Sequence, residues 1–157
     1  MKPKLYVETT IPSLLTAWPS RDVIIAGQQQ ATRAWWDERR ERYQLFVSVL
    51  VMKEAKRGDA TAVAERIRAL RECRVLPFPT EAEDLTRALL ASRLIPAKAE
   101  ADAAHIAIAS VHGMDFLLTW NCTHIANGIV MHAVSILSRE MGFEPPIVCT
   151  PEELMEG

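Results

Sequence analysis

Short apolar runs alternate along the chain with longer segments of helical periodicity. The runs have the length and the β-branched or aromatic content of buried strands, and they cover residues 4–8, 45–49, 75–76, 116–119 and 147–149. Helical patterns fill the intervals, and helices are predicted over residues 22–42, 59–72, 80–93, 99–112 and 127–141. Two shorter helices are predicted, one opening near residues 12–13 and one running from the second strand to residue 56.

Turn and capping residues support these boundaries. Asp59 and Thr80 are predicted to cap the helices that follow them, and Asn127 is predicted to start the last long helix. Gly113 and Gly142 come directly after helical patterns, where glycine commonly ends a helix. Residues 150–153 (Thr-Pro-Glu-Glu) have the pattern of a capping box at the start of a final turn.

The alternation of strands and helices predicts an α/β fold, with a central parallel sheet of about five strands and helices on both faces. No repeat, low-complexity tract or linker divides the chain, so residues 1–157 are predicted to form a single domain. In sheets of this kind, ligands bind at the carboxyl ends of the strands. Polar residues directly after the strands are therefore the first candidates for a functional site.

Composition narrows the function classes. With 157 residues, of which 49% are hydrophobic and 24% charged, the chain has the profile of a soluble globular domain. The net charge of -2 provides no global basic field, so any contact with nucleic acid needs a local basic face. The three cysteines form no CxxC pair or zinc pattern, and their odd number without a signal peptide favours a reducing cytoplasm. No apolar run approaches the roughly 20 residues that cross a membrane.

Oxygen-bearing side chains stand at four positions where they are chemically unusual. Glu8 and Asn121 follow the first and fourth predicted strands, and Glu54 and Asp102 lie in helical segments among apolar residues. An acid in apolar surroundings is costly unless it is paired or bound to a metal. Carboxylate and amide oxygens suit Mg²⁺ or Mn²⁺, whereas zinc prefers histidine or cysteine at fixed spacings. The four positions therefore predict one shared metal site, of the kind that hydrolyses phosphodiesters.

Each of these residues also has a structural alternative. Glu8 at a strand end is more often a cap or an ion-pair partner, and Glu54 has basic neighbours that offer surface pairing. Asp102 suits the first turn of a helix because the helix dipole favours an acid there, and Asn121 can open the turn after its strand. The ordered combination in an α/β pattern is far less expected by chance than any single member.

Hydroxyl and imidazole side chains near these positions are predicted to support the site. Thr9, Ser48 and Thr119 lie at strand ends, where each can hold a water or a phosphate or simply cap the strand. His105 lies three residues after Asp102 on the same helical face. There it can orient the aspartate, contact substrate or be an ordinary core histidine.

An adjacent pair of tryptophans marks the helical segment 22–42. Neighbouring positions on a helix point about 100° apart, so we expect one ring of Trp35 and Trp36 in the core and the other at its edge or exposed. Several arginines lie nearby, but acidic neighbours dilute their charge. This favours core packing with a protein contact over an RNA-binding face.

Four segments of the chain resemble the PIN-domain family. Residues 5–10 (Leu-Tyr-Val-Glu-Thr-Thr) resemble its opening strand and acid, and residues 48–54 (Ser-Val-Leu-Val-Met-Lys-Glu) resemble its second strand and acidic helix. Residues 102–107 (Asp-Ala-Ala-His-Ile-Ala) resemble its central aspartate helix, and residues 118–121 (Leu-Thr-Trp-Asn) its last site segment. Each motif is short, but all four occur in order across nearly the whole chain.

The resemblance implies a Rossmann-like, three-layer α/β/α sandwich that cleaves RNA with Mg²⁺ or Mn²⁺ held by the four oxygen-bearing residues. It also implies a VapC-type toxin of a type II toxin–antitoxin pair, with an antitoxin partner and a homodimeric assembly. The chain departs from the family pattern at Glu8, where Asp is usual, and at Asn121, where many members carry Asp. Three acids instead of four should leave one firmly bound ion and weaken the binding of a second.

Two other function classes stay open at this point. The same fold can serve as a catalytically weak or inactive PIN-like module that binds nucleic acid or a protein partner, because Glu8 and Asn121 alter the usual site. A receiver-like or phosphatase-like α/β protein is disfavoured, since the first strand ends in a single acid and no glycine-rich phosphate loop is present.

Overall fold

Five parallel strands form one sheet in the order β3-β2-β1-β4-β5 in the computed structural model, which describes residues 1–156. The strands are β1 (Lys4–Val7), β2 (Gln44–Ser48), β3 (Arg74–Leu76), β4 (Phe116–Leu118) and β5 (Ile147–Cys149). All five predicted strands are confirmed, with ends that differ from the predicted ones by at most one residue. The chain builds the sheet outward from β1 to β3 and then returns to the other side of β1 with β4 and β5.

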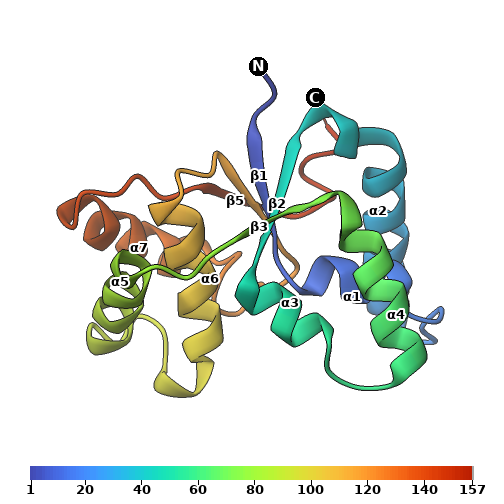
Figure 1. The fold of residues 1–157 in the computed structure, drawn as a ribbon, viewed down its shortest axis with the longest axis horizontal. Helices are drawn as coiled ribbons and strands as arrows, with labels where there is room; N and C mark the ends of the chain where they lie inside the picture. The colour runs from blue at the N-terminus through green and yellow to red at the C-terminus, as the bar shows by residue number, and fades with distance from the viewer. Residues whose placement is uncertain (157) are drawn as a thin grey trace.

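Helices cover both faces of this sheet (Figure 1). They are α1 (Thr10–Thr16), α2 (Val23–Arg39), α3 (Val49–Ala55), α4 (Ala60–Ala69), α5 (Thr80–Ala91), α6 (Glu100–Val111) and α7 (Gly128–Glu140). Single 3-10 turns extend α2 and α4 and precede α6, at η1 (Arg40–Arg42), η2 (Leu70–Glu72) and η3 (Ala97–Ala99). In Figure 1, α1, α2 and α4 lie on one side of the sheet and α5, α6 and α7 on the other, so the predicted three-layer α/β/α arrangement is confirmed. None of the described helices is long and apolar enough to span a bilayer.

Side-chain caps begin several of these helices as predicted. The Asp59 carboxylate accepts hydrogen bonds from two backbone N–H groups in the first turn of α4, and the Asn127 amide oxygen does the same for α7. The capping box near the C-terminus is also present. The Thr150 backbone N–H donates to the Glu153 carboxylate at 3.1 Å, and the Glu153 N–H donates to the Thr150 hydroxyl at 3.3 Å.

The predicted cap at Thr80 is wrong. Thr80 is already the first residue of α5, and the N-cap position is Pro79, which has no side-chain cap hydrogen bond. The Pro79 carbonyl accepts hydrogen bonds from the backbone N–H groups of Ala82 and Glu83, both at 3.0 Å. The helix therefore begins one residue earlier than the polar side chain indicated.

The core lies against both faces of the two central strands. Leu5, Tyr6 and Val7 of β1 are fully buried, and so are Leu117 and Leu118 of β4. Strands covered on both faces need continuous apolar runs rather than alternating ones, and this is the pattern that made them recognisable in the sequence. α6 is buried without interruption from residue 103 to residue 110, and its main packing partner is α5.

Both tryptophans of α2 are buried, so the prediction that one of them would lie at the edge or be exposed is wrong. Trp35 is 0% and Trp36 is 7% exposed. Trp35 packs against Tyr43, with 5.7 Å between the ring centroids. The Arg40 guanidinium covers the Trp36 ring at 5.6 Å from its centroid, an arrangement stabilised by the ring quadrupole. The pair consequently offers no open aromatic face to RNA or to a protein.

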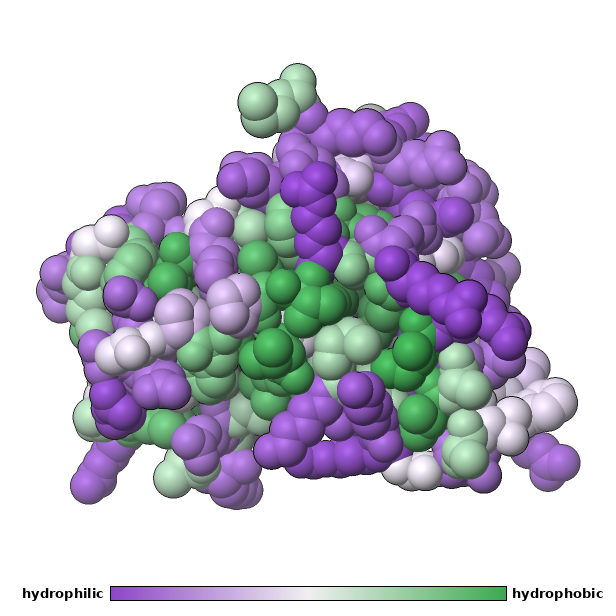
Figure 2. Space-filling view, viewed as in Figure 1, coloured by the Kyte–Doolittle hydropathy of each residue, from purple (hydrophilic) through white to green (hydrophobic). Residues whose placement is uncertain are grey.

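An apolar region is exposed instead over the open edge of the sheet. β3 is an edge strand, and its Val75 is half exposed, as is Val49 at the start of α3. In Figure 2, apolar colour gathers in the middle of the face that β3 crosses in Figure 1. β3 is only three residues long and begins with the charged Arg74, features that limit unwanted edge-to-edge pairing.

The cap of α2 yields a test of helix stability. Asp22 Oδ1 accepts hydrogen bonds from the backbone N–H groups of Ile24 (2.9 Å) and Ile25 (3.1 Å). Asp22→Ala is expected to lower the free energy of unfolding by about 1 kcal/mol, as measured by urea titration. Asp37→Ala, which removes an exposed acid within the same helix without removing a cap, is the matched control. Equal losses in the two variants would contradict the capping role.

The cysteines are expected to differ sharply in reactivity. All three are free; Cys122 is exposed, whereas Cys73 and Cys149 are buried. Burial, aided by the nearby charges of Glu72 and Glu153 respectively, raises the pKa of each of the two buried thiols to about 12. Only the thiolate is nucleophilic, so at pH 8 a thiol reagent should label Cys122 alone in the native protein. Mass spectrometry before and after denaturation checks this, and rapid native labelling of all three would refute it.

Candidate active site

β1 and β4 are neighbours in the sheet, and the chain adds strands on one side of β1 before it adds β4 and β5 on the other. In folds of this kind, ligands usually bind at the carboxyl ends of two such strands. Glu8 directly follows β1, and Asn121 follows β4 after two intervening residues. Glu54 projects from α3 and Asp102 from the first turn of α6. All four residues, together with Thr9, line one pocket of about 520 Å³. Folding thus brings together side chains that are scattered along the chain.

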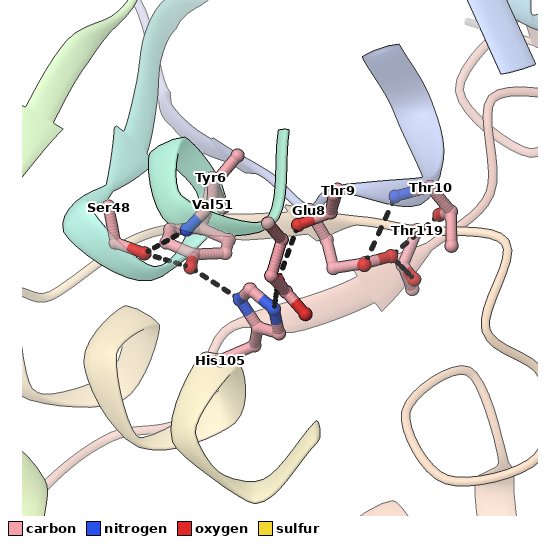
Figure 3. A network of polar contacts seen from close by, with 9 residues as sticks. Tyr6, Glu8, Thr9, Thr10, Ser48, Val51, His105 and Thr119 are labelled. Atoms are coloured by element: carbon pink, nitrogen blue, oxygen red, sulfur yellow. Dashed lines mark hydrogen bonds and ion pairs between the residues drawn. The ribbon is translucent and has the colours of Figure 1, made fainter. Parts of the chain in front are cut away.

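Glu8 is held tightly inside this pocket. It is only 5% exposed. Its Oε1 accepts hydrogen bonds from the hydroxyls of Thr10 (2.6 Å) and Thr119 (2.5 Å), and its Oε2 accepts one from the Thr10 backbone N–H (3.1 Å). In Figure 3 the Glu8 carboxylate points toward these two threonines. The carboxylate therefore ties the end of β1 to the segment after β4, and both of its oxygens are in use.

Glu54 is positioned through one of its two oxygens. Oε1 accepts a hydrogen bond from the Thr9 hydroxyl and contacts His105 Nε2, both at 2.7 Å. Burial alone would raise the pKa of the Glu54 carboxyl, but the hydrogen bonds from His105 and from the Thr9 hydroxyl hold that pKa below its usual value. Glu54 is consequently ionised at neutral pH. Among the described residues, nothing is hydrogen-bonded to its Oε2.

Asp102 has a similar arrangement with a different histidine. Its Oδ2 lies 2.9 Å from His124 Nδ1, and its Oδ1 has no hydrogen-bond partner within residues 1–156. The His124 backbone N–H donates to the Asn121 side-chain oxygen at 3.1 Å. The Asn121 side chain thus stabilises the turn after β4, which is the structural role that the sequence also allowed for it. The same turn carries His124, the histidine that contacts Asp102.

The residues predicted to support the site occupy the positions that Figure 3 shows. Thr9 contacts Glu54, whereas Ser48 and Thr119 are fully buried and bond to protein groups. Ser48 accepts a hydrogen bond from the Val51 N–H and so caps α3. These two buried hydroxyls support neighbouring residues and are not surfaces for a phosphate.

His105 contacts a different acid from the one its position in the sequence indicated. It lies one helical turn from Asp102 but points toward Glu54, and its other ring nitrogen, Nδ1, lies 2.7 Å from the Tyr6 hydroxyl. The helical repeat places two residues on one face but does not decide which element that face meets. Here the face meets β1 and α3.

Three residues near the site were not singled out from the sequence. In the sequence, Tyr6 is part of the apolar run of the first strand, Thr10 belongs to the turn after that strand, and His124 closely follows Asn121. Their sequence signals are weak because each acts through a partner on another element: Tyr6 on His105, Thr10 on Glu8, and His124 on Asp102. Only the hydroxyl-rich run at residues 9–10 beside Glu8 offered a hint.

The donor set fits a hard divalent cation in its chemistry. Three carboxylates and one amide share a pocket, and Glu54 and Asp102 each keep one oxygen that is not hydrogen-bonded to the described residues. Glu8 fits less well, because both of its oxygens already accept hydrogen bonds. Within residues 1–156, no three acidic, histidine or cysteine side chains gather closely enough to form a ready-made metal cluster.

Comparison with known proteins identifies the fold. No protein-family model matches the sequence, and no curated protein is significantly similar to it. Among solved structures, VapBC2 from Rickettsia felis, determined bound to a DNA fragment from its promoter, superposes with a TM-score of 0.59. The match covers 93% of this chain and 97% of the other, at 10% sequence identity.

The chain therefore has a PIN-like α/β fold, the class that the four sequence motifs indicated. Within that class, its structural match is to a VapC toxin of the PIN-domain type. The low sequence identity restricts this likeness to the fold, so the chemistry has to be argued from the site itself.

Proposed function

We propose that this protein is a Mg²⁺- or Mn²⁺-dependent ribonuclease that hydrolyses RNA phosphodiester bonds. The proposal is carried by one observation: Glu8, Glu54, Asp102 and Asn121, from four separate segments, line a single pocket at the carboxyl ends of the strands. The PIN-like fold, which is typical of nucleases, supports it.

The roles of the site residues follow from their hydrogen bonds. Glu54 and Asp102 would be the main metal ligands through their free oxygens, with Asn121 and the more occupied Glu8 assisting. When bound, a divalent ion activates water and neutralises phosphate charge. Without a cation the carboxylates would repel the RNA backbone, which gives a physical reason for metal dependence. Thr9 holds Glu54 in place, and Thr119 holds Glu8.

Metal-dependent cleavage of RNA is the direct test. A panel of labelled structured and single-stranded RNAs is incubated with the purified protein and Mn²⁺, and parallel samples receive EDTA. Cleavage that needs Mn²⁺ or Mg²⁺ and is lost with EDTA is the expected outcome. Cleavage that persists in EDTA, or no cleavage of any RNA, would count against the assignment.

We also propose a biological setting, that of the toxin in a type II toxin–antitoxin pair acting in the cytoplasm as a single-domain homodimer. Three exposed apolar residues close together in the sequence support an antitoxin-binding surface: Trp18, Val23 and Ile24 are 92%, 85% and 74% exposed. They lie in the loop before α2 and in its first turn, and the next residue, Ile25, lines the pocket.

The exposed apolar region around Val49 and Val75, next to β3, supports self-association (Figure 2). Size-exclusion chromatography with light scattering tests the dimer.

A second candidate function is a PIN-like binding module with little or no turnover. The observation in its favour is the full occupation of the Glu8 oxygens, together with the absence of a compact cluster of acids among the described residues. Calorimetric titration with Mn²⁺ separates the two functions. Binding in the micromolar range supports the nuclease, whereas no binding up to millimolar metal supports the module.

A further inference from the structure

A chain of buried hydrogen bonds joins Ser48, Tyr6 and His105 (Figure 3) and ends on Glu54 at the pocket. The Tyr6 hydroxyl lies 2.8 Å from Ser48 Oγ and 2.7 Å from His105 Nδ1, and His105 Nε2 lies 2.7 Å from Glu54 Oε1. Tyr6 and Ser48 are fully buried, and His105 is 1% exposed. These residues come from β1, β2 and α6, so the chain links three elements behind the fourth, α3, which carries Glu54.

The direction of the donated protons can be assigned by following each donor to an acceptor. Ser48 Oγ accepts from the Val51 N–H at 3.2 Å, so its own hydrogen is available for the Tyr6 oxygen. A phenol is protonated at neutral pH, so the Tyr6 hydroxyl has a hydrogen to donate. Its O–H then donates to His105 Nδ1, and the remaining ring hydrogen on Nε2 donates to the Glu54 carboxylate. In this arrangement the hydrogens of Ser48, Tyr6 and His105 each have an acceptor.

The opposite direction leaves a defect. If His105 Nδ1 carried the proton and donated to Tyr6, the phenol would have to donate to Ser48 Oγ. Ser48 already accepts from Val51, and its own hydrogen would then lack an acceptor among the described residues. An unsatisfied donor in a fully buried position is costly. The first assignment, a neutral imidazole with its hydrogen on Nε2, is therefore favoured.

We propose that His105 is a positioning residue that orients Glu54 for metal binding, and that Tyr6 and Ser48 set the tautomer in which it does so. The part that concerns metal binding rests on the proposed function. With its hydrogen on Nε2, His105 holds Glu54 Oε1 jointly with Thr9. The carboxylate is thereby fixed in one rotamer, and Oε2 is the oxygen left for a ligand in the pocket.

The tautomer is tested without metal, by NMR of the histidine ring nitrogens. In ¹⁵N-labelled parent protein, His105 should show a protonated Nε2 and an unprotonated Nδ1, with its signals assigned by their loss in His105→Gln. Tyr6→Phe removes the donor to Nδ1 and should shift these signals, as should Glu54→Gln. Tyr43→Phe, which alters the chain's other tyrosine, outside the network, should leave them unchanged. A protonated Nδ1 in the parent, or no response to Tyr6→Phe and Glu54→Gln, would overturn the proposal.

Calorimetric titration with Mn²⁺ tests the positioning role. His105→Leu removes the donor to Glu54 and should weaken Mn²⁺ binding by roughly 10- to 100-fold, the usual effect of losing a partner of a metal ligand. His105→Gln can place an N–H near the position of Nε2 and should restore part of the affinity. Tyr43→Phe should bind Mn²⁺ like the parent. A purely structural role for His105 would lower the unfolding midpoint in urea without this graded recovery of affinity.

The two measurements separate the positioning role from the proposed function. If the parent binds no Mn²⁺ but the NMR signals of the His105 ring nitrogens respond as expected, the metal-dependent function is wrong. The hydrogen bond by which His105 positions Glu54 is then still supported. If the parent binds Mn²⁺ and His105→Leu binds it equally well while remaining folded, the positioning role is wrong and the metal site stands.

Discussion

Asp102→Asn is expected to lower the rate of Mn²⁺-dependent RNA cleavage by more than about 100-fold while leaving the protein folded. Loss of an outer hydrogen-bond partner of a metal ligand already costs roughly 10- to 100-fold, and Asp102 is proposed as a direct ligand. The substitution removes the negative charge but preserves size and one side-chain oxygen. Asp102→Asn therefore weakens cation binding far more than it disturbs side-chain packing.

The matched control for this variant is Asp84→Asn. Asp84 is an exposed aspartate in α5 that pairs with Arg87, away from the pocket. Initial rates are measured at saturating Mn²⁺ with one labelled RNA, and circular dichroism and urea unfolding report the fold of each variant. Asp84→Asn should cleave like the parent. Equal cleavage by Asp102→Asn and the parent would remove Asp102 from the site and with it the central element of the proposed metal centre.

Trp35→Ala is expected to destabilise the protein by about 3–5 kcal/mol, the usual cost of truncating a buried aromatic residue to alanine. Trp35 is fully buried and packs against both Trp36 and Tyr43. Removing the indole leaves a cavity between α2 and the start of β2 that the fully packed surroundings can fill only in part. The free energy of unfolding is measured by urea titration.

Trp35→Phe is the matched variant. Within the described residues the Trp35 indole N–H has no hydrogen-bond partner, so replacement by phenylalanine removes a buried donor that contributes no bond and keeps most of the packing. We therefore expect a much smaller loss of stability than with Trp35→Ala. Comparable losses in the two variants would show that the tryptophan contributes through something other than buried apolar volume.

The strands could be predicted because burial on both faces of a strand leaves a recognisable pattern in the sequence. A strand covered on both faces needs an uninterrupted apolar run, such as Leu5 to Val7 or Phe116 to Leu118, and local pattern is enough to find it. The cap at Thr80 shows the limit of this approach. A polar residue signals that a helix begins nearby, but backbone hydrogen bonds to Pro79 decided the position.

The candidate site was only partly predictable. The sequence identified Glu8, Glu54, Asp102 and Asn121 by residue type and place, and all four do line one pocket. It could not show that Glu8 has both oxygens hydrogen-bonded whereas Glu54 and Asp102 each keep one free. That difference depends on which hydroxyls and imidazoles approach each carboxylate in space.

By itself, the sequence determined the alternation of elements, the parallel sheet and the identity of the oxygens at its carboxyl edge, because these follow from local periodicity and residue chemistry. Only the tertiary structure decided how those oxygens are held. Thr119 reaches Glu8 across 111 positions and Tyr6 reaches His105 across 99, and a contact between such distant residues exists only once β1, β4 and α6 have packed together. The physical reason is that a hydrogen bond depends on separation and angle in space, which the order of residues along the chain does not specify.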